Sequence, residues 1–120
     1  MIQEYKFGLI TIDGKTYDYD VEVRWTGEVL KWWRKESHVI DLEDIQRAIE
    51  QNPDTIIIST GESGEAKVTD RLKQGLEVKG IQLIVDLTEQ AAKTFNIINE
   101  ESAEEEGEQR KVIGLFHLTC

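Results

Sequence analysis

Residues 55–64, with the sequence TIIISTGESG, constrain the fold of this 120-residue chain more than any other stretch. The β-branched run Ile56 to Ile58 predicts a strand, Thr55–Ser59, that is buried on both faces, as in a sheet covered by helices. Glycines and hydroxyl residues follow the strand directly, and a helical pattern begins a few residues later. Because α/β proteins place ligands at the carboxyl ends of such strands, this loop is the first candidate for a binding site.

The composition indicates a single soluble domain spanning residues 1–120. Apolar residues make up 39% and charged residues 32% of the chain, which is typical of globular proteins. A net charge of −10 argues against nucleic-acid binding, and no apolar run is long enough to cross a membrane. The lone cysteine and the lack of a signal segment favour a cytoplasmic location. We expect a monomer or a weak homo-oligomer without a cofactor, and we interpret the acidic residues 100–108 as a solvated turn.

Residues 5–33 have the pattern of three antiparallel strands. Residues 5–12 lead into Asp13-Gly14, the favoured pair of a type I′ hairpin turn, and Thr26-Gly27 leads into a third strand at 28–33. In the strand between them, residues 17–25, apolar and polar residues alternate, which predicts one buried and one solvated face. Carboxylates two residues apart on a strand lie ~7 Å from each other, so a solvated face is favoured over a metal site. The predicted buried face carries Tyr17, Tyr19, Val21, Val23 and Trp25, and the solvated face carries Asp18, Asp20, Glu22 and Arg24.

Helices and strands alternate from residue 41 onward. Further strands are predicted at 55–59, 81–85 and 111–119. The final strand is apolar on both faces over residues 112–115, which predicts a central position covered on two sides. Asp41, Thr69 and Thr88 are the predicted N-caps of three helices, and Asn52-Pro53 and Gly80 are the predicted ends of the first two. The order of elements therefore predicts one α/β domain with an appended β-hairpin layer.

The candidate ligand site combines the loop after the 55–59 strand with two basic residues before the first helix. Its glycines permit positive φ angles and close backbone approach, and its hydroxyl groups bond a ligand without adding charge. The loop lacks the lysine of a P-loop and the third glycine of GxGxxG, so a phosphate cradle is only weakly indicated. We expect a small anion or an acidic group of a partner protein as the ligand. The predicted ligand-binding residues are Arg34, His38, Ser59, Thr60, Gly61, Ser63, Gly64 and His117.

Catalytic residues are not predicted. On a regular strand His117 and Cys120 point to opposite faces, and a terminal carboxylate beside the thiol disfavours its thiolate form. His117 is therefore interpreted as a partly buried, hydrogen-bonded residue at the end of the sheet. Of the two neighbouring indole side chains, Trp32 and Trp33, we expect one in the core and one exposed as the wall of a site or as part of an interface. Arg34 either binds a ligand or stacks on Trp33.

Seven segments in register resemble the Mth938-domain proteins, a family of small α/β proteins found from archaea to animals. The resemblance covers nearly the whole chain, and it departs at Ser59 and Thr69, where relatives usually carry Gly and Pro. The segments are residues 12–21 (IDGKTYDYDV), the WWR at 32–34 with His38, IIISTG and GESG at 56–64, AKV at 66–68, Gly80-Ile81, residues 88–96 and the terminal HLTC.

The resemblance implies a three-layer β plus α/β/α fold around a mixed five-stranded sheet whose last strand is antiparallel. It also implies a binding or assembly role, since animal relatives are linked to adipocyte differentiation and to assembly of respiratory complex I. Two function classes follow: a non-catalytic binding or assembly module, and a small hydrolase- or transferase-like enzyme with His117 as general base. The enzyme requires His117 within hydrogen-bond reach of Thr60, Ser63 or Cys120 in a concave pocket.

Overall fold

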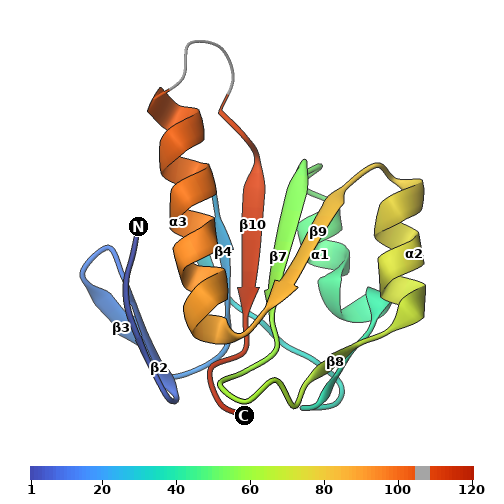
Figure 1. The fold of residues 1–120 in the computed structure, drawn as a ribbon, viewed down its shortest axis with the longest axis horizontal. Helices are drawn as coiled ribbons and strands as arrows, with labels where there is room; N and C mark the ends of the chain where they lie inside the picture. Colours follow the sequence, from blue (N-terminus) through green and yellow to red (C-terminus); the bar gives the residue numbers. More distant parts are fainter. Residues whose placement is uncertain (105–108) are drawn as a thin grey trace.

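The computed structural model describes residues 1–104 and 109–120, in which helices cover both faces of a central sheet (Figure 1). The three-stranded antiparallel sheet consists of β1 (Ile2–Lys6), β2 (Leu9–Ile12) and β3 (Lys15–Tyr17). The central sheet has the order β5 (Val29–Lys31), β4 (Val21–Arg24), β10 (Val112–Phe116), β7 (Thr55–Ser59) and β9 (Gln82–Asp86). The short strands β6 (Val39–Ile40) and β8 (Lys67–Val68) pair with each other. The helices are a 3-10 turn (Leu42–Ile45), α1 (Gln46–Ile49), α2 (Asp70–Val78) and α3 (Thr88–Glu104).

Two hydrophobic cores lie on opposite faces of the central sheet, because successive side chains of a strand alternate between its faces. Ile57 and Phe116 belong to the core that includes α3 and the three-stranded sheet. Ile56 and Leu115 belong to the core that includes α1 and α2. All four side chains are fully buried, which confirms that these two strands are covered on both sides. The arrangement confirms the predicted α/β fold with an added antiparallel β layer.

The last strand, β10, occupies the middle of the central sheet, as its apolar faces predicted. It pairs antiparallel with β4 and parallel with β7, which in turn pairs parallel with β9. Since β5 is antiparallel to β4, the strand that opposes the other four is β4. The sheet is mixed as expected, but the last strand is antiparallel to one neighbour only.

Local turn and capping signals were good predictors. Asp13 and Gly14 both have positive φ angles, 48° and 83°, as a type I′ turn requires. Asp41 forms a capping box with the residue three positions on, and the Thr69 hydroxyl accepts from the first turn of α2. Gly80 has a φ of 71° just beyond α2, which confirms the predicted helix end.

The predicted continuous strand at 17–25 is wrong. The chain leaves the three-stranded sheet after Tyr17 and enters the central sheet at Val21. The predicted strand at 5–12 is also wrong, because a turn divides it into β1 and β2. With β5 and β6, six strands rather than three precede the first helix. Asp20 lies in the break, where its carbonyl accepts from the Trp32 amide at 2.8 Å and its carboxylate accepts from the Leu118 amide at 2.8 Å. These two bonds replace the ladder bonds of a continuous strand and carry the chain from one layer to the next.

The predicted solvated face is also wrong at Glu22, which is only 1% exposed. Its carboxylate accepts from Nε of Arg24 at 2.8 Å and from Nε of Arg47 at 3.1 Å. A buried charge is tolerated only when it is paired and hydrogen-bonded, and here two guanidinium groups satisfy it. Tyr19, predicted on the buried face, is 38% exposed, because the break at 18–20 changes the side to which it points.

Smaller differences concern the helices. The first predicted helix is a 3-10 turn followed by the single turn α1. Thr88 begins α3, and its hydroxyl donates into the central sheet, 2.6 Å from the His117 carbonyl oxygen, instead of accepting as an N-cap. The expected turn at 100–108 is helical up to Glu104, and residues 105–108 lie outside the described residues. Among the described helices, none combines the length and the apolar character needed to cross a membrane. The cytoplasmic location stays a prediction.

Candidate functional site

The candidate site lies at the edge of the central sheet where the parallel strands β7, β9 and β10 end. Parallel strands bring their carboxyl ends to the same edge, so Ser59, Asp86 and His117 end or directly follow neighbouring strands there. Figure 1 shows this edge at the bottom of the molecule, where the loop after β7 passes the chain's last residues. Residues 60–66 form that loop.

His117 is the centre of a buried polar network at this edge. Its side chain is 4% exposed, and its Nδ1 atom lies 2.8 Å from Oδ2 of Asp20. Arg34, with a side chain that is 6% exposed, donates from Nη1 to the same carboxylate oxygen at 2.7 Å. The sequence suggested no orienting carboxylate for this histidine, because Asp20 is 97 residues away along the chain.

The protonation of His117 follows from its neighbours. Nδ1 must carry a proton to donate to Asp20, so the 3.0 Å contact between Nδ1 and Nη2 of Arg34 is not a hydrogen bond. Nη2 donates instead to the Ser37 carbonyl oxygen, also at 3.0 Å. Burial raises the pKa of Asp20, but hydrogen bonds from His117, the Leu118 amide and Arg34 outweigh it and hold that pKa below its ordinary value. The pair is therefore an imidazole that donates from Nδ1 to a carboxylate.

Two buried hydroxyl groups tie the backbone of His117 to the neighbouring elements. The His117 amide donates to Oγ of Ser59 at 2.8 Å, and the Thr88 hydroxyl donates to the His117 carbonyl oxygen at 2.6 Å. Both hydroxyl residues have no exposed surface. Ser59 thus has a structural part in holding the end of β10 against β7, and its hydroxyl is directed at backbone, not at the imidazole ring.

Several amides of the loop after β7 donate to other parts of the chain. The Thr60 amide donates to the Asp86 carbonyl oxygen at 3.0 Å, and the Glu62 amide donates to the Thr119 carbonyl oxygen at 2.7 Å. The Glu65 amide donates to the carbonyl oxygen of Cys120 at 3.2 Å. Gly61 has a φ of 101°, and a Cβ there would lie 2.5 Å from that same oxygen. The last residues of the chain therefore occupy two of the loop amides and block close approach of a ligand to the backbone at Gly61.

The basic residues before the first helix separate into a buried and an exposed one. Arg34 was expected to be accessible to a ligand, but its side chain is buried. Its guanidinium group stacks on Trp32 at 4.6 Å, not on Trp33. Trp32 is 4% exposed and Trp33 is 77% exposed, which confirms one core and one exposed indole. His38 is exposed and lies near the loop, with Nε2 3.8 Å from a carboxylate oxygen of Glu65.

A hollow of about 300 Å³, which we call the lysine hollow, opens beside the same loop. Thr60, Lys67 and Lys73 are the residues in its lining with polar or charged side chains. Neither lysine has an ion-pair partner among the described residues, and none of the lining residues is acidic. The remaining lining residues are Gly64, Ala66, Val68 and Val85.

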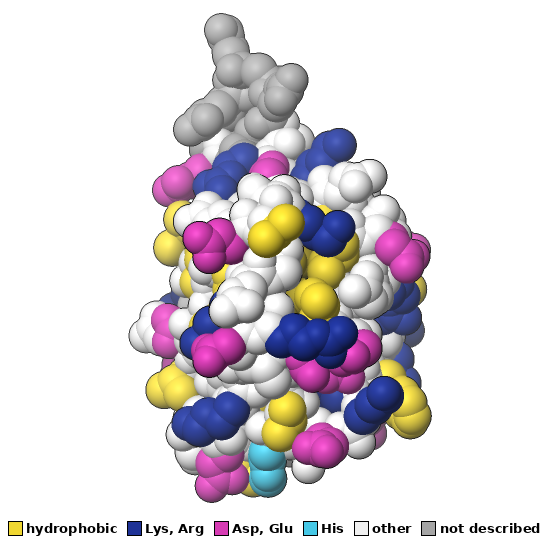
Figure 2. Space-filling model, turned by 90° about the vertical axis from the view of Figure 1, so that its right-hand side faces the viewer, with side chains coloured by type: hydrophobic (Ala, Val, Ile, Leu, Met, Phe, Trp, Pro, Cys, Tyr) yellow, Lys and Arg dark blue, Asp and Glu magenta, His cyan; other side chains and the backbone are white. Residues whose placement is uncertain are grey.

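Figure 2 shows the face of the molecule that carries α2, with basic and acidic side chains interleaved across it. There is no continuous positive patch on this face. On this face, any attraction for an anion is therefore local and is not reinforced by a wider positive surface.

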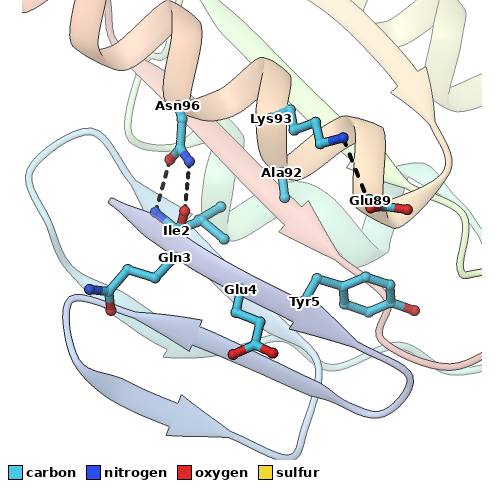
Figure 3. Close-up of a pocket in the computed structure, with 8 residues that line it drawn as sticks. All are labelled: Ile2, Gln3, Glu4, Tyr5, Glu89, Ala92, Lys93 and Asn96. Carbon is cyan, nitrogen blue, oxygen red and sulfur yellow. Dashed lines mark hydrogen bonds and ion pairs between the residues drawn. The ribbon is translucent and has the colours of Figure 1, made fainter.

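A second hollow, of about 250 Å³, lies between β1 and α3 (Figure 3). There the Asn96 side chain accepts from the Ile2 amide at 2.8 Å and donates to the Ile2 carbonyl oxygen at 2.7 Å. Lys93, the one cation in its lining, pairs with Glu89 at 3.9 Å. Side chains of this hollow hold the three-stranded sheet against α3, which is a structural role. We therefore favour the lysine hollow as the ligand site.

Sequence reasoning missed four residues of this edge. Asp20 was placed on a solvated strand face, and Thr88 was assigned to a helix cap. Lys67 and Lys73 carried no motif, and their shared position depends on β8 and α2 meeting the loop after β7. The β-strand that precedes the loop was the only signal in the sequence pointing to this edge.

Comparisons with known proteins agree with the fold. Residues 2–117 match a family described as protein of unknown function, DUF498/DUF598. The structure of the conserved hypothetical protein PH1505 from Pyrococcus horikoshii OT3 is 25% identical, with a TM-score of 0.80 over 100% of this chain and 99% of that chain. The structure named MT938 is 28% identical, with a TM-score of 0.78 over 100% and 98% of the two chains. A Mth938-like domain from Bordetella pertussis, 16% identical, shares the fold with a TM-score of 0.68 over 98% and 84%.

Proposed function

The chain belongs to the Mth938-domain family of proteins of unknown function, and on that premise we propose that it is a non-catalytic binding module for a carboxylate group. The carboxylate belongs either to a small organic acid or to an Asp or Glu side chain of a partner protein. It binds in the lysine hollow beside the loop after β7.

The observation that carries this proposal is that an acidic protein places two lysines in one hollow, neither with an ion-pair partner in the described part of the chain. Lys67 donates from Nζ to the Gly64 carbonyl oxygen at 3.2 Å, which positions its ammonium group and leaves two hydrogens for a ligand. Lys73 reaches the same hollow from α2. Two ammonium groups around one hollow favour an anion over a cation, and carboxylates accept several such hydrogen bonds.

The apolar lining narrows the ligand class. Ala66, Val68 and Val85 contribute methyl groups to the hollow, in roughly equal share with the polar groups. A small organic acid, or an Asp or Glu side chain with its one or two methylene groups, matches both the polar and the apolar lining of the hollow better than inorganic phosphate does. Thr60, which also lines the hollow, carries a hydroxyl group that donates to the Asp86 carbonyl oxygen at 3.3 Å and can accept a hydrogen bond.

The enzyme alternative would need a catalytic arrangement around His117, which the described residues do not form. A general base acts on a nucleophile or substrate within hydrogen-bond reach of its free nitrogen. Nε2 of His117 is buried and has no hydrogen-bond partner among the described residues. The hydroxyls of Ser59 and Thr88 bond to the backbone of His117, so the hydroxyls nearest to it are engaged elsewhere. We therefore propose no catalytic role.

The affinity expected of a free small acid is low. Exposed charge pairs contribute about 0.2–1 kcal/mol each, and a net charge of −10 opposes approach of an anion. We expect a dissociation constant on the order of 1 mM, which corresponds to about −4 kcal/mol. A partner protein that adds contact area around the hollow would bind more tightly at the same point.

Chemical-shift mapping by NMR tests the proposal, with succinate, acetate, phosphate and chloride titrated into the full chain at constant ionic strength. We expect saturable shifts of Thr60, Gly64 and Lys67 amides with succinate, and weaker ones with phosphate. The double variant Lys67→Gln/Lys73→Gln should bind succinate about fivefold more weakly, which equals about 1 kcal/mol.

The matched control is Lys111→Gln, which removes one exposed ammonium group at the opposite end of the central sheet. Equal weakening in this control would assign the effect to net charge and reject the site. Shifts that cluster around the hollow between β1 and α3 (Figure 3) would also reject it.

A further inference from the structure

A group of three side chains with metal-binding atoms lies beside the loop after β7, next to the lysine hollow but separate from its lining. His38 precedes β6, Glu65 precedes β8, and Cys120 follows β10. The imidazole nitrogen, carboxylate oxygen and thiol sulfur all lie within 4.8 Å of one another. We call these three residues the edge triad.

The spacing of the edge triad is close to that of a metal site. Nε2 of His38 and Oε2 of Glu65 are 3.8 Å apart. Bond lengths of about 2.0–2.3 Å in tetrahedral geometry place neighbouring zinc ligands roughly 3.3–3.8 Å apart. Small rotations of two exposed side chains are therefore sufficient to close the triad around one ion.

The backbone holds the three ligands together before any ion binds. The Lys67 amide donates to the His38 carbonyl oxygen at 2.8 Å, and the Glu65 amide donates to the Cys120 carbonyl oxygen at 3.2 Å. These bonds link all three ligand-carrying segments. Because the backbone is already ordered, binding orders only side chains, which lowers the entropic cost of forming the site.

A second observation is an unpartnered imidazole nitrogen in the neighbouring histidine. His117 lies edge-on to His38, with 6.5 Å between ring centroids, and its Nε2 is buried without a hydrogen-bond partner among the described residues. In the neutral tautomer that donates from Nδ1 to Asp20, Nε2 is an acceptor that lacks a donor. A histidine oriented by a carboxylate through its other nitrogen is the arrangement that surrounds metal ions in proteins.

We propose that the edge triad binds a Zn²⁺ ion through His38, Glu65 and Cys120, with a water molecule in the fourth position that donates to Nε2 of His117. A thiolate and an imidazole favour zinc over magnesium or calcium. On binding, the S–H bond of Cys120 breaks, its proton is released to solvent, and the sulfur forms a bond to the ion. Thiolate and carboxylate together neutralise the two positive charges.

The test is a titration of the metal-free full chain with Co²⁺, followed by displacement with Zn²⁺. We expect one Co²⁺ per chain, a near-ultraviolet thiolate-to-cobalt charge-transfer band and tetrahedral d–d bands in the visible range. Co²⁺ binding should release one proton from the thiol, and Zn²⁺ should then abolish both sets of bands without further proton release. Cys120→Ser should remove the charge-transfer band, and His38→Gln or Glu65→Gln should weaken binding at least tenfold.

Glu62→Gln is the matched control, because it makes the same charge change on the same loop outside the triad. All four variants alter side chains at the surface or sheet edge, and thermal melts of the metal-free forms verify that each folds. Absence of the charge-transfer band, a band that persists in Cys120→Ser, or equal weakening in Glu62→Gln would overturn the proposal.

Imidazole ¹⁵N shifts separate the two histidine roles. Zn²⁺ should move the His38 Nε2 resonance by direct coordination, and it should move the His117 Nε2 resonance in the direction of an accepted hydrogen bond. An unchanged His38 resonance would reject the zinc site, and an unchanged His117 resonance would reject the bridging water. Since the lysine hollow does not enter this experiment, its result is independent of carboxylate binding.

Discussion

Replacing Asp20 with asparagine tests whether the network around His117 is a buried ionic structure or a solvated surface. The side chain of Asp20 is 19% exposed, whereas those of its partners Arg34 and His117 are 6% and 4% exposed. Asparagine preserves the volume and can still accept from the Leu118 amide. Its NH₂ group, however, has no lone pair for the donors of Arg34 and His117, so the guanidinium is left buried without a counter-charge.

Removing one partner of a buried pair costs about 3–5 kcal/mol, and the partial exposure of Asp20 places this variant at the lower end, about 3 kcal/mol. With an unfolding entropy of about 2.1 cal/mol/K per residue, a chain of 120 residues has roughly 0.25 kcal/mol/K in total. We therefore expect Asp20→Asn to lower the melting temperature by about 12 °C. Thermal unfolding at pH 7, followed by circular dichroism and calorimetry, measures it.

Asp18→Asn is the matched control, because Asp18 is exposed and lies two residues away on the same segment. It should change stability by less than about 0.5 kcal/mol. In an Arg34→Met background, Asp20→Asn should cost at least about 1.5 kcal/mol less, since no cation is left unpaired. A loss below about 1 kcal/mol for Asp20→Asn alone, or full additivity with Arg34→Met, would refute the buried network.

The pH dependence follows from the lowered pKa of Asp20. A carboxyl group with a folded-state pKa below its ordinary value of 3.8 stabilises the fold fully above that pH. The contribution is lost as the pH falls through the lowered pKa, so the difference between wild type and Asp20→Asn should shrink below about pH 4. A difference that stays constant down to the acid limit of folding would contradict this assignment.

Three further variants test the hydrophobic cores and the buried ion pairs of Glu22 with Arg24 and Arg47. Gly114→Ala should lower the free energy of unfolding in urea by about 1–3 kcal/mol, because the new Cβ would overlap the Phe116 ring and lie 3.1 Å from Phe95. Unchanged stability would show that the rings move aside. Deleting residues 116–120 should abolish cooperative unfolding, since Phe116 and the end of β10 are buried, and a truncated chain with an unchanged melting temperature would disprove this. Glu22→Gln should cost about 2 kcal/mol in the same assay, because two guanidinium groups lose their carboxylate, and a value near zero would mean that solvent reaches them.

The sequence by itself determined the features that depend on a few adjacent residues. The turn at Asp13-Gly14, the cap at Thr69 and the helix end at Gly80 follow from local backbone preferences, and the structure has all three. The Thr55–Ser59 strand and the apolar faces of β10 follow from periodicity, because a strand that is apolar on both sides must be covered on both sides.

Only the tertiary structure decided where the polar groups belong. Glu22 reads as a surface residue because a sequence pattern cannot show that Arg47, 25 positions away, will pair with it. Asp20 breaks a regular alternation of side chains because its partners, Arg34 and His117, reach it from 14 and 97 positions away. Hydrophobic burial depends on each side chain's own free energy of transfer and is therefore visible in the sequence, whereas a buried charge depends on a partner that only the folded chain supplies.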